Sequence, residues 1–188
     1  MRPGLVCIGA VVLLCQFAAM GAAARERAPD LEVRADPSGG VRARATLVIP
    51  APPSIVQEIL TDFPKWPELF AVKMRLAHLE WREGRAITDF YIRHAFLPAE
   101  RRLLCESEIL PNGGLITKLL GGDFKRYQRT WTLAPESGGR HTRAEFDLVV
   151  EVDTVAPDWL IAFTLRRELE THFRILKESA MGRAQQGS

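Results

Sequence analysis

Apolar and polar residues alternate along most of the chain after residue 30, as they do in strands that cover a core with one face. Leu31 to Ala35 alternates in this way and ends at Asp36-Pro37-Ser38-Gly39-Gly40, a turn by composition. Val41 to Ile49 alternates again. The two segments therefore predict a β-hairpin. Its second strand is expected to end at Pro50-Ala51-Pro52-Pro53, because proline cannot donate to a strand ladder.

The segment after these prolines predicts two short helical elements. Ile55, Val56, Ile59 and Leu60 are at helical spacing after Pro53, and proline is tolerated in the first turn of a helix. The next segment contains two prolines three residues apart, which forbid a long helix. We therefore expect tight turns there, with the following side chains directed inward: Phe63, Trp66, Leu69 and Phe70.

Period-two alternation continues from Val72 to Asp153 and is broken only by short turn sequences. These breaks are Glu83-Gly84, Leu97-Pro98-Ala99, Pro111-Asn112-Gly113-Gly114, Gly121-Gly122-Asp123 and Ser137-Gly138-Gly139. They divide the segment into six predicted strands. Because breaks this short cannot hold crossover helices, we expect neighbouring strands to pair antiparallel as a meander.

The period changes to that of an amphipathic helix after Pro157. One arc of this helix is apolar apart from a histidine, and it consists of Ala162, Leu165, Leu169, His172, Phe173, Leu176 and Ala180. Charged residues, Glu168 among them, lie outside the arc. We expect a long C-terminal helix that packs its apolar stripe on the sheet.

The first 24 residues have a separate pattern. Arg2 precedes an apolar run from Leu5 to Met20, and small residues then form an Ala-x-Ala site that ends at Ala24. The run is shorter than the ~20 residues of a spanning helix and is typical of a secretory signal peptide; retention as an N-terminal anchor is the alternative. We expect a signal peptide over 1–24, a linker over 25–30, one domain over 31–182 and a flexible tail over 183–188. The protein would then be exported, either periplasmic or secreted.

Composition narrows the classes of partner. Cleavage after Ala24 would leave 164 residues (188 − 24), which suits one domain. It would leave 24 basic and 23 acidic residues, a formal net charge of +1, with no long run of either sign. This balance gives no electrostatic footprint for nucleic acid. Cys105 would be the only thiol, so we expect it to be a buried apolar residue outside any intramolecular disulfide; the alternative is a disulfide between two molecules in an oxidising compartment.

In this order, the predicted elements resemble the START-like superfamily, which includes polyketide cyclases, ubiquinone-binding proteins and plant hydrophobic-ligand carriers. The motifs behind the resemblance are Ile49-Pro50-Ala51-Pro52 before Val56, Leu60-Thr61-Asp62 with Trp66-Pro67-Glu68, Trp131, and Pro157 with Trp159-Leu160. The resemblance implies an α+β helix-grip fold. In this fold a curved antiparallel β-sheet wraps around a long C-terminal α-helix, and two short helices follow the first main strand. It also implies a cavity between sheet and helix for a lipid, quinone or terpenoid. The superfamily has no universal catalytic residues to transfer.

Candidate ligand contacts are residues that the pattern places on the inward faces. A cavity of this kind is apolar with a few polar groups that orient the ligand, and the alternative for each polar residue is a satisfied core or rim position. The full set of candidates is Phe90, Ile92, His94, Cys105, Tyr127, Arg129, Trp131, Phe146, Leu169, His172 and Phe173. The sequence predicts no metal site and no cofactor.

Three functions are compatible with these residues. The first is a carrier or presenter of a hydrophobic small molecule or lipid. The second is a cyclase or aromatase that uses His94 or His172 as general base. The third is a protein-interaction module in which large inward side chains fill the cavity: Trp66, Phe90, Phe96, Trp131, Phe146, Phe163 and Phe173. The sequence has no nucleophile elbow and no glycine-rich phosphate loop, which favours the carrier over an enzyme.

A short apolar segment near Lys118 predicts transient contact with a membrane surface. Its apolar residues lie close to Phe124 and to the basic residues Lys118, Lys125 and Arg126. The apolar residues are Leu115, Ile116, Leu119 and Leu120. The alternative is that these side chains complete a strand in the core.

Overall fold

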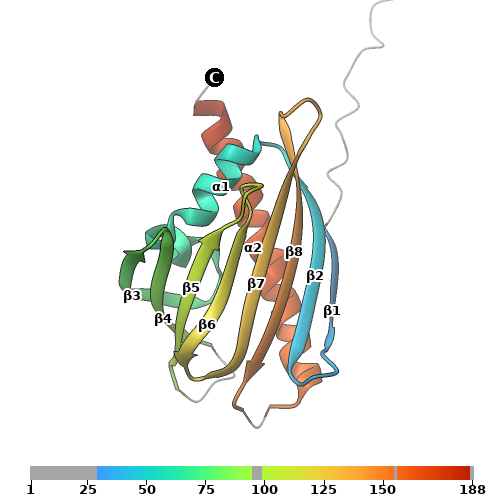
Figure 1. Ribbon diagram of the computed structural model, residues 1–188. Helices are drawn as coiled ribbons and strands as arrows, with labels where there is room; N and C mark the ends of the chain where they lie inside the picture. The colour runs from blue at the N-terminus through green and yellow to red at the C-terminus, as the bar shows by residue number, and fades with distance from the viewer. Residues whose placement is uncertain (1–28, 95–98, 155, 187–188) are drawn as a thin grey trace, which may run out of the picture.

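The computed structural model describes residues 29–94, 99–154 and 156–186. The predicted signal peptide, most of the predicted linker, the turn at Leu97-Pro98 and Phe96 lie outside these residues. A curved sheet wraps around a long helix (Figure 1). In chain order the elements are β1 (Asp30–Ala35), β2 (Val41–Ile49), α1 (Pro53–Thr61), the 3-10 helix η1 (Phe63–Leu69), β3 (Lys73–Arg82), β4 (Arg85–Arg93), β5 (Arg101–Ile109), β6 (Leu115–Gly122), β7 (Phe124–Glu136), β8 (His141–Val152) and α2 (Asp158–Gln186).

The eight strands form one antiparallel sheet in the order β1-β2-β8-β7-β6-β5-β4-β3. The hairpin β1–β2 and the six-stranded meander β3–β8 are as predicted. The sheet is joined where β2 pairs with β8, with Val41 opposite Val150 and Ile49 opposite Thr142. The helix-grip α+β fold is confirmed.

The two short helical elements close one end of the sheet. Helix α1 begins at Pro53 and buries Val56, Ile59 and Leu60. In η1 the indole of Trp66 is buried, and its Nε1 donates a hydrogen bond to the carbonyl of Leu60 at 3.0 Å. This bond fixes η1 against the end of α1 and places the Trp66 ring over the sheet.

Helix α2 crosses the concave face of the sheet (Figure 1). From Leu169 onward the helix contributes Leu169, His172, Phe173, Leu176 and Ala180 to the buried interior, as the arc predicted. The helix continues through Gln186, so residues 183–186, which were expected in a flexible tail, are helical. The guanidinium of Arg183 donates to the carboxylate of Asp62 at 3.3 Å and ties this last turn to the end of α1.

The core beneath α2 is aromatic. Trp131 is fully buried, and its ring centroid lies 4.8 Å from that of Phe146 and 5.8 Å from that of Phe173. Phe146 and Phe173 meet edge to face at 5.2 Å. Such pairs contribute about 0.5–1.5 kcal/mol each beyond the burial of apolar area, so this cluster anchors the helix to β7 and β8.

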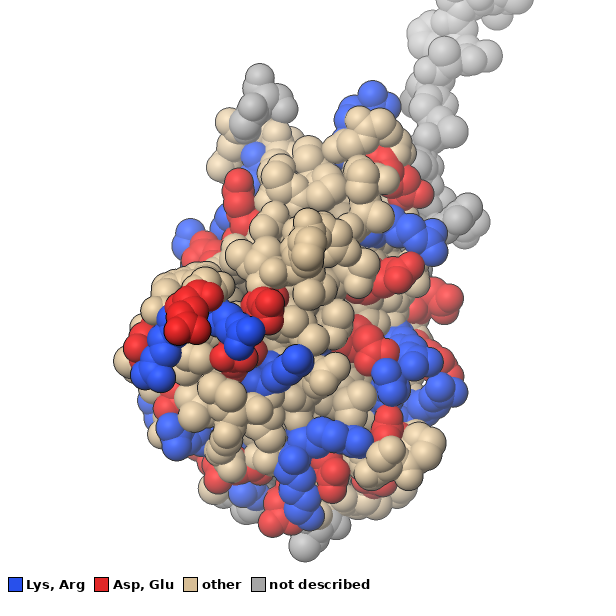
Figure 2. All heavy atoms as spheres, viewed as in Figure 1, with Lys and Arg blue, Asp and Glu red and all other residues tan. Residues whose placement is uncertain are grey.

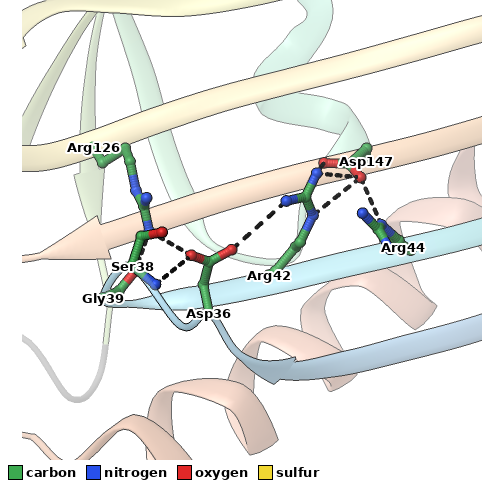
Figure 3. A network of polar contacts seen from close by, with 7 residues as sticks. All are labelled: Asp36, Ser38, Gly39, Arg42, Arg44, Arg126 and Asp147. Atoms are coloured by element: carbon green, nitrogen blue, oxygen red, sulfur yellow. Dashed lines mark hydrogen bonds and ion pairs between the residues drawn. The ribbon is translucent and has the colours of Figure 1, made fainter.

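A polar network holds the β1–β2 hairpin to the centre of the sheet (Figure 3). The Asp36 carboxylate accepts the backbone N–H of Ser38 at 2.9 Å and the Arg126 guanidinium of β7 at 3.2 Å. The backbone bond from Ser38 and the charge of Arg126 keep the pKa of Asp36 below its ordinary value. Nearby, Arg42 of β2 makes a forked contact with Asp147 of β8, with its shortest bond at 2.9 Å. These contacts fix the turn after β1 over β7 and β8.

Acidic and basic side chains are interspersed over the face shown in Figure 2. Among the described residues, no helix is both long enough and apolar enough to cross a membrane.

Candidate ligand-binding cavity

A cavity lies between the concave face of the sheet and the N-terminal half of α2. Its volume is about 210 Å³, and it is partly open to solvent. Leu148, Val150 and Val152 of β8 line one wall, and Leu165 and Leu169 of α2 line the opposite one. Before Leu169 the residues of α2 are at most partly buried, whereas Leu169, Phe173 and Leu176 are buried, so the first turns of the helix leave room for the cavity. The walls are apolar apart from a few polar side chains.

Most of the predicted contact residues line this cavity. They are Phe90, Ile92, His94, Tyr127, Arg129, Phe146, Leu169 and His172. Alternation predicted the positions on the sheet because one face of an antiparallel sheet is covered, and the helical arc predicted Leu169 and His172. Whether they bind a ligand stays a prediction.

Three predicted contacts lie elsewhere. Cys105, Trp131 and Phe173 are buried in the core and do not line the cavity. They share an inward face with lining residues, but Trp131 and Phe173 lie where sheet and helix are in direct contact, with ring centroids 5.8 Å apart. Burial raises the pKa of the Cys105 thiol to about 12, so it is an inert apolar residue, as expected. Phe163, which was expected to face inward, is 52 % exposed.

Several lining residues were not among the predicted ligand contacts. Phe70, Val72 and Met74 come from the chain between η1 and the first half of β3, and Thr154 and Ala156 follow β8. Glu168 lines the cavity although the helical arc placed it outside the apolar stripe. The arc describes the part of α2 that packs on the sheet, and over the cavity a wider sector of the helix faces inward. No signal in the sequence marks this difference.

The neutral form of His172 is fixed by its surroundings. The ring is 1 % exposed and stacks on Phe70 with centroids 4.2 Å apart. Its Nδ1 lies 2.8 Å from the carbonyl of Leu69, an acceptor, so Nδ1 carries the proton and Nε2 presents a lone pair. Burial lowers the pKa of His172 to about 4, the bond to Leu69 opposes this shift, and the charge of Arg129 adds to it. His172 is therefore uncharged at neutral pH.

Arg129 is the one arginine or lysine among the described residues that line the cavity. It lies on β7 opposite Leu148 of β8, and it is only 4 % exposed. Its guanidinium carbon is 4.1 Å from the centroid of the Trp66 ring. This cation–π contact fixes the plane of the guanidinium against η1.

A second polar pair lies on the other side of the cavity, between the end of β4 and α2. Nε2 of His94 is 3.8 Å from a carboxylate oxygen of Glu168. Both side chains are partly exposed, at 18 % and 27 %. They belong to the rim, where the strand ends and the first turns of α2 meet solvent.

The residues of the predicted membrane tip separate in the structure. Leu115 is buried in the core, whereas Leu120 is 52 % exposed at the far end of β6. Two further aromatic side chains are exposed at the start of α2, Trp159 at 70 % and Phe163 at 52 %. The neighbouring helix residues Leu160, Ile161 and Thr164 line the cavity. Exposed aromatic residues thus lie beside the cavity on α2.

The described residues contain no group of histidine, cysteine and carboxylate side chains that could hold a metal ion. The fold and the apolar cavity define a helix-grip protein of the START-like class. A family model described as "Polyketide cyclase / dehydrase and lipid transport" matches residues 40–180. Because the match covers most of the chain, the protein belongs to this family. A comparison with curated proteins found no match.

Solved structures share the fold. A protein of Thermus thermophilus is 22 % identical, with a TM-score of 0.61 over 76 % of this chain and 99 % of that one. A START superfamily protein of Mycobacterium smegmatis is 18 % identical, with a TM-score of 0.59 over 78 % and 99 %. The Zhui aromatase/cyclase of Streptomyces is 12 % identical, with a TM-score of 0.57 over 82 % and 94 %.

Proposed function

We propose that this protein is an exported carrier that binds a hydrophobic small molecule or lipid in the cavity between the sheet and α2, and carries or presents it. The observation behind the proposal is the apolar cavity of about 210 Å³. Small-molecule sites are concave and mostly apolar, with few polar groups, and this cavity has that composition. The family description, which includes lipid transport, supports the same function.

The cavity size limits the ligand. Typical small-molecule sites measure about 300–1,000 Å³, and the 210 Å³ here is smaller. A compact molecule would fit inside it. A longer lipid would place one end in the cavity and extend the remainder through the open side.

Carriage fits the histidines better than cyclisation does. A general base works best when its pKa is near the operating pH, and the pKa of His172 is about 4. His172 would therefore remove a substrate proton poorly at neutral pH. This leaves His94 as the candidate general base of a cyclase. If the protein is a cyclase, His94→Ala should abolish turnover. If it is a carrier, His94→Ala should leave ligand binding largely intact.

The interaction module with a filled cavity is less consistent with the side-chain positions. Trp131 and Phe173 pack in the core, and Phe163 points to solvent. None of the three enters the cavity, which stays open between the remaining large side chains.

We further propose that loading takes place at a membrane surface. Trp159 and Phe163 lie one helical turn apart on α2, and Arg167 is 4.8 Å above the Phe163 ring. Exposed aromatic rings next to basic side chains favour the interface of an anionic bilayer. They flank Leu160 and Ile161, which line the cavity, so a bound surface would lie next to its opening.

Titration calorimetry with 1-decanol, an uncharged apolar probe, tests the binding site. The wild type is expected to bind one molecule. Leu165→Trp fills the cavity from α2 and should weaken binding at least tenfold, whereas Glu170→Trp, on the exposed face of the same helix, should not. Absence of binding to the wild type, or equal binding by both variants, would contradict a ligand site in this cavity.

A further inference from the structure

The Arg129 guanidinium stacks on Trp66 but is buried without a hydrogen-bond or ion-pair partner among the described residues. Its Nε and Nη2 atoms are inaccessible to solvent and make no hydrogen bond to any residue that the structure describes. No carboxylate of the described chain lies within ion-pair distance of it. A buried cation without a paired anion carries a desolvation penalty that proteins otherwise offset with a carboxylate or a hydrogen-bond network. An anion that pairs with Arg129 therefore has to come from outside the described residues.

The polar neighbours of Arg129 are occupied or unsuitable. Thr117, opposite Arg129 on β6, shares its hydroxyl hydrogen bond with Ser107 at 2.9 Å. Glu168, the only acidic side chain among the described lining residues, lies 3.8 Å from His94 and forms no ion pair with Arg129. His172 is neutral and its N–H points to Leu69. Nothing in the described walls neutralises the guanidinium.

Electrostatic effects agree with this geometry. The positive charge of Arg129 acts to lower the pKa of Cys105, Tyr127 and His172, which surround it on β5, β7 and α2. In each case burial acts more strongly on the pKa, but the field of Arg129 reaches all three groups. A field of this kind in a low-dielectric cavity attracts an anion.

We propose that the cavity binds a hydrophobic carboxylic acid whose carboxylate pairs with Arg129, with the apolar part of the acid lying toward the open side. The inference rests on the proposed ligand-binding function and names the ligand class. A planar guanidinium matches a carboxylate in a forked contact, and the stack on Trp66 fixes its plane. The small cavity disfavours the bulkier, more strongly hydrated phosphate head group.

The depth of Arg129 sets the orientation of the ligand. Arg129 pairs with Leu148, and β8 ends four residues later at Val152. At a rise of ~3.3 Å per residue, the head group would lie roughly 13 Å from the end of the strand. Val150, Val152, Leu165 and Leu169 line the cavity beside this path and would contact the hydrocarbon.

Titration calorimetry at pH 7.5 with decanoate, 1-decanol and decyl phosphate tests the proposal on delipidated protein. The wild type should bind decanoate at least tenfold more tightly than 1-decanol. Arg129→Met should weaken decanoate binding roughly 10- to 100-fold, as expected for loss of hydrogen bonds to a charged group, and should weaken 1-decanol binding less, because an alcohol loses only an uncharged acceptor contact. Arg129→Lys keeps the positive charge but loses the forked contact. Its affinity for decanoate should therefore lie between those of the wild type and Arg129→Met.

The outcomes separate this inference from the proposed function. If the wild type binds neither decanoate nor 1-decanol, the ligand-binding function itself fails. If both bind with equal affinity and Arg129→Met has no effect, the function stands and the acid-binding inference is overturned. Tighter binding of decyl phosphate than of decanoate would also overturn it, in favour of a phosphate ligand. Circular dichroism of the variants confirms that each is folded.

Discussion

Replacing Arg129 with methionine should stabilise the ligand-free protein. Several kcal/mol of desolvation oppose burial of an unpaired guanidinium, and the contact with Trp66 at 4.1 Å offsets about 1–2 kcal/mol of this. Methionine retains much of the aliphatic volume and adapts to irregular space. We expect a net gain of about 2 kcal/mol in the free energy of unfolding. For a domain of this size the gain corresponds to a rise in Tm of about 4–8 °C.

The matched control is Arg126→Met, three residues earlier on the same strand. Arg126 donates to the Asp36 carboxylate and to the carbonyl of Gly39 (Figure 3). Its loss removes these bonds and should lower Tm. Thermal unfolding of delipidated wild type and of both variants, followed by circular dichroism, measures the difference. A Tm of Arg129→Met at or below that of the wild type would contradict this expectation, because Arg129 would then have a structural partner.

Four other predictions rest on the same structure. The pKa of His172 is 6.5 in the unfolded state and about 4 in the folded state. Between pH 4 and pH 6.5 His172 is therefore protonated in the unfolded state and neutral in the folded state. Stability should therefore fall by about 3 kcal/mol as the pH drops from 7 to 4; urea unfolding of His172→Gln should lack this component. Phe173→Ala removes a ring from the aromatic core and should cost about 3–5 kcal/mol in urea unfolding. Cys105 should resist iodoacetamide at pH 8 in the native protein and react once unfolded, and rapid native labelling would contradict its burial. Replacing both Trp159 and Phe163 with serine should reduce co-sedimentation with anionic vesicles severalfold without changing affinity for 1-decanol, and unchanged sedimentation would remove these rings from any membrane contact.

The fold could be predicted because each element has a local cause in the sequence. The two periods of alternation mark the strands and α2, and the prolines at 53, 64 and 67 mark α1 and η1. The pairing of β2 with β8 has no local signal, since it joins segments about a hundred residues apart. No pattern in the sequence predicts that pairing.

The cavity could be predicted in part. Alternation separates inward from outward residues but not cavity from core, so His172 and Phe173 looked alike although only His172 lines the cavity. The cavity beside the first half of α2 depends on how the helix packs against the sheet, and this packing is a property of the whole fold. The lack of a partner for Arg129 likewise depends on every neighbouring element and can be seen only in three dimensions.

The central claim is that a hydrophobic molecule occupies the cavity between the sheet and α2. The most direct test is native mass spectrometry of the protein purified from its own host, with organic extraction and identification of whatever remains bound. We expect a stoichiometric hydrophobic molecule in the wild type and none in the Leu165→Trp variant. A protein that is empty on purification, and still empty after incubation with total membrane lipid, would contradict it.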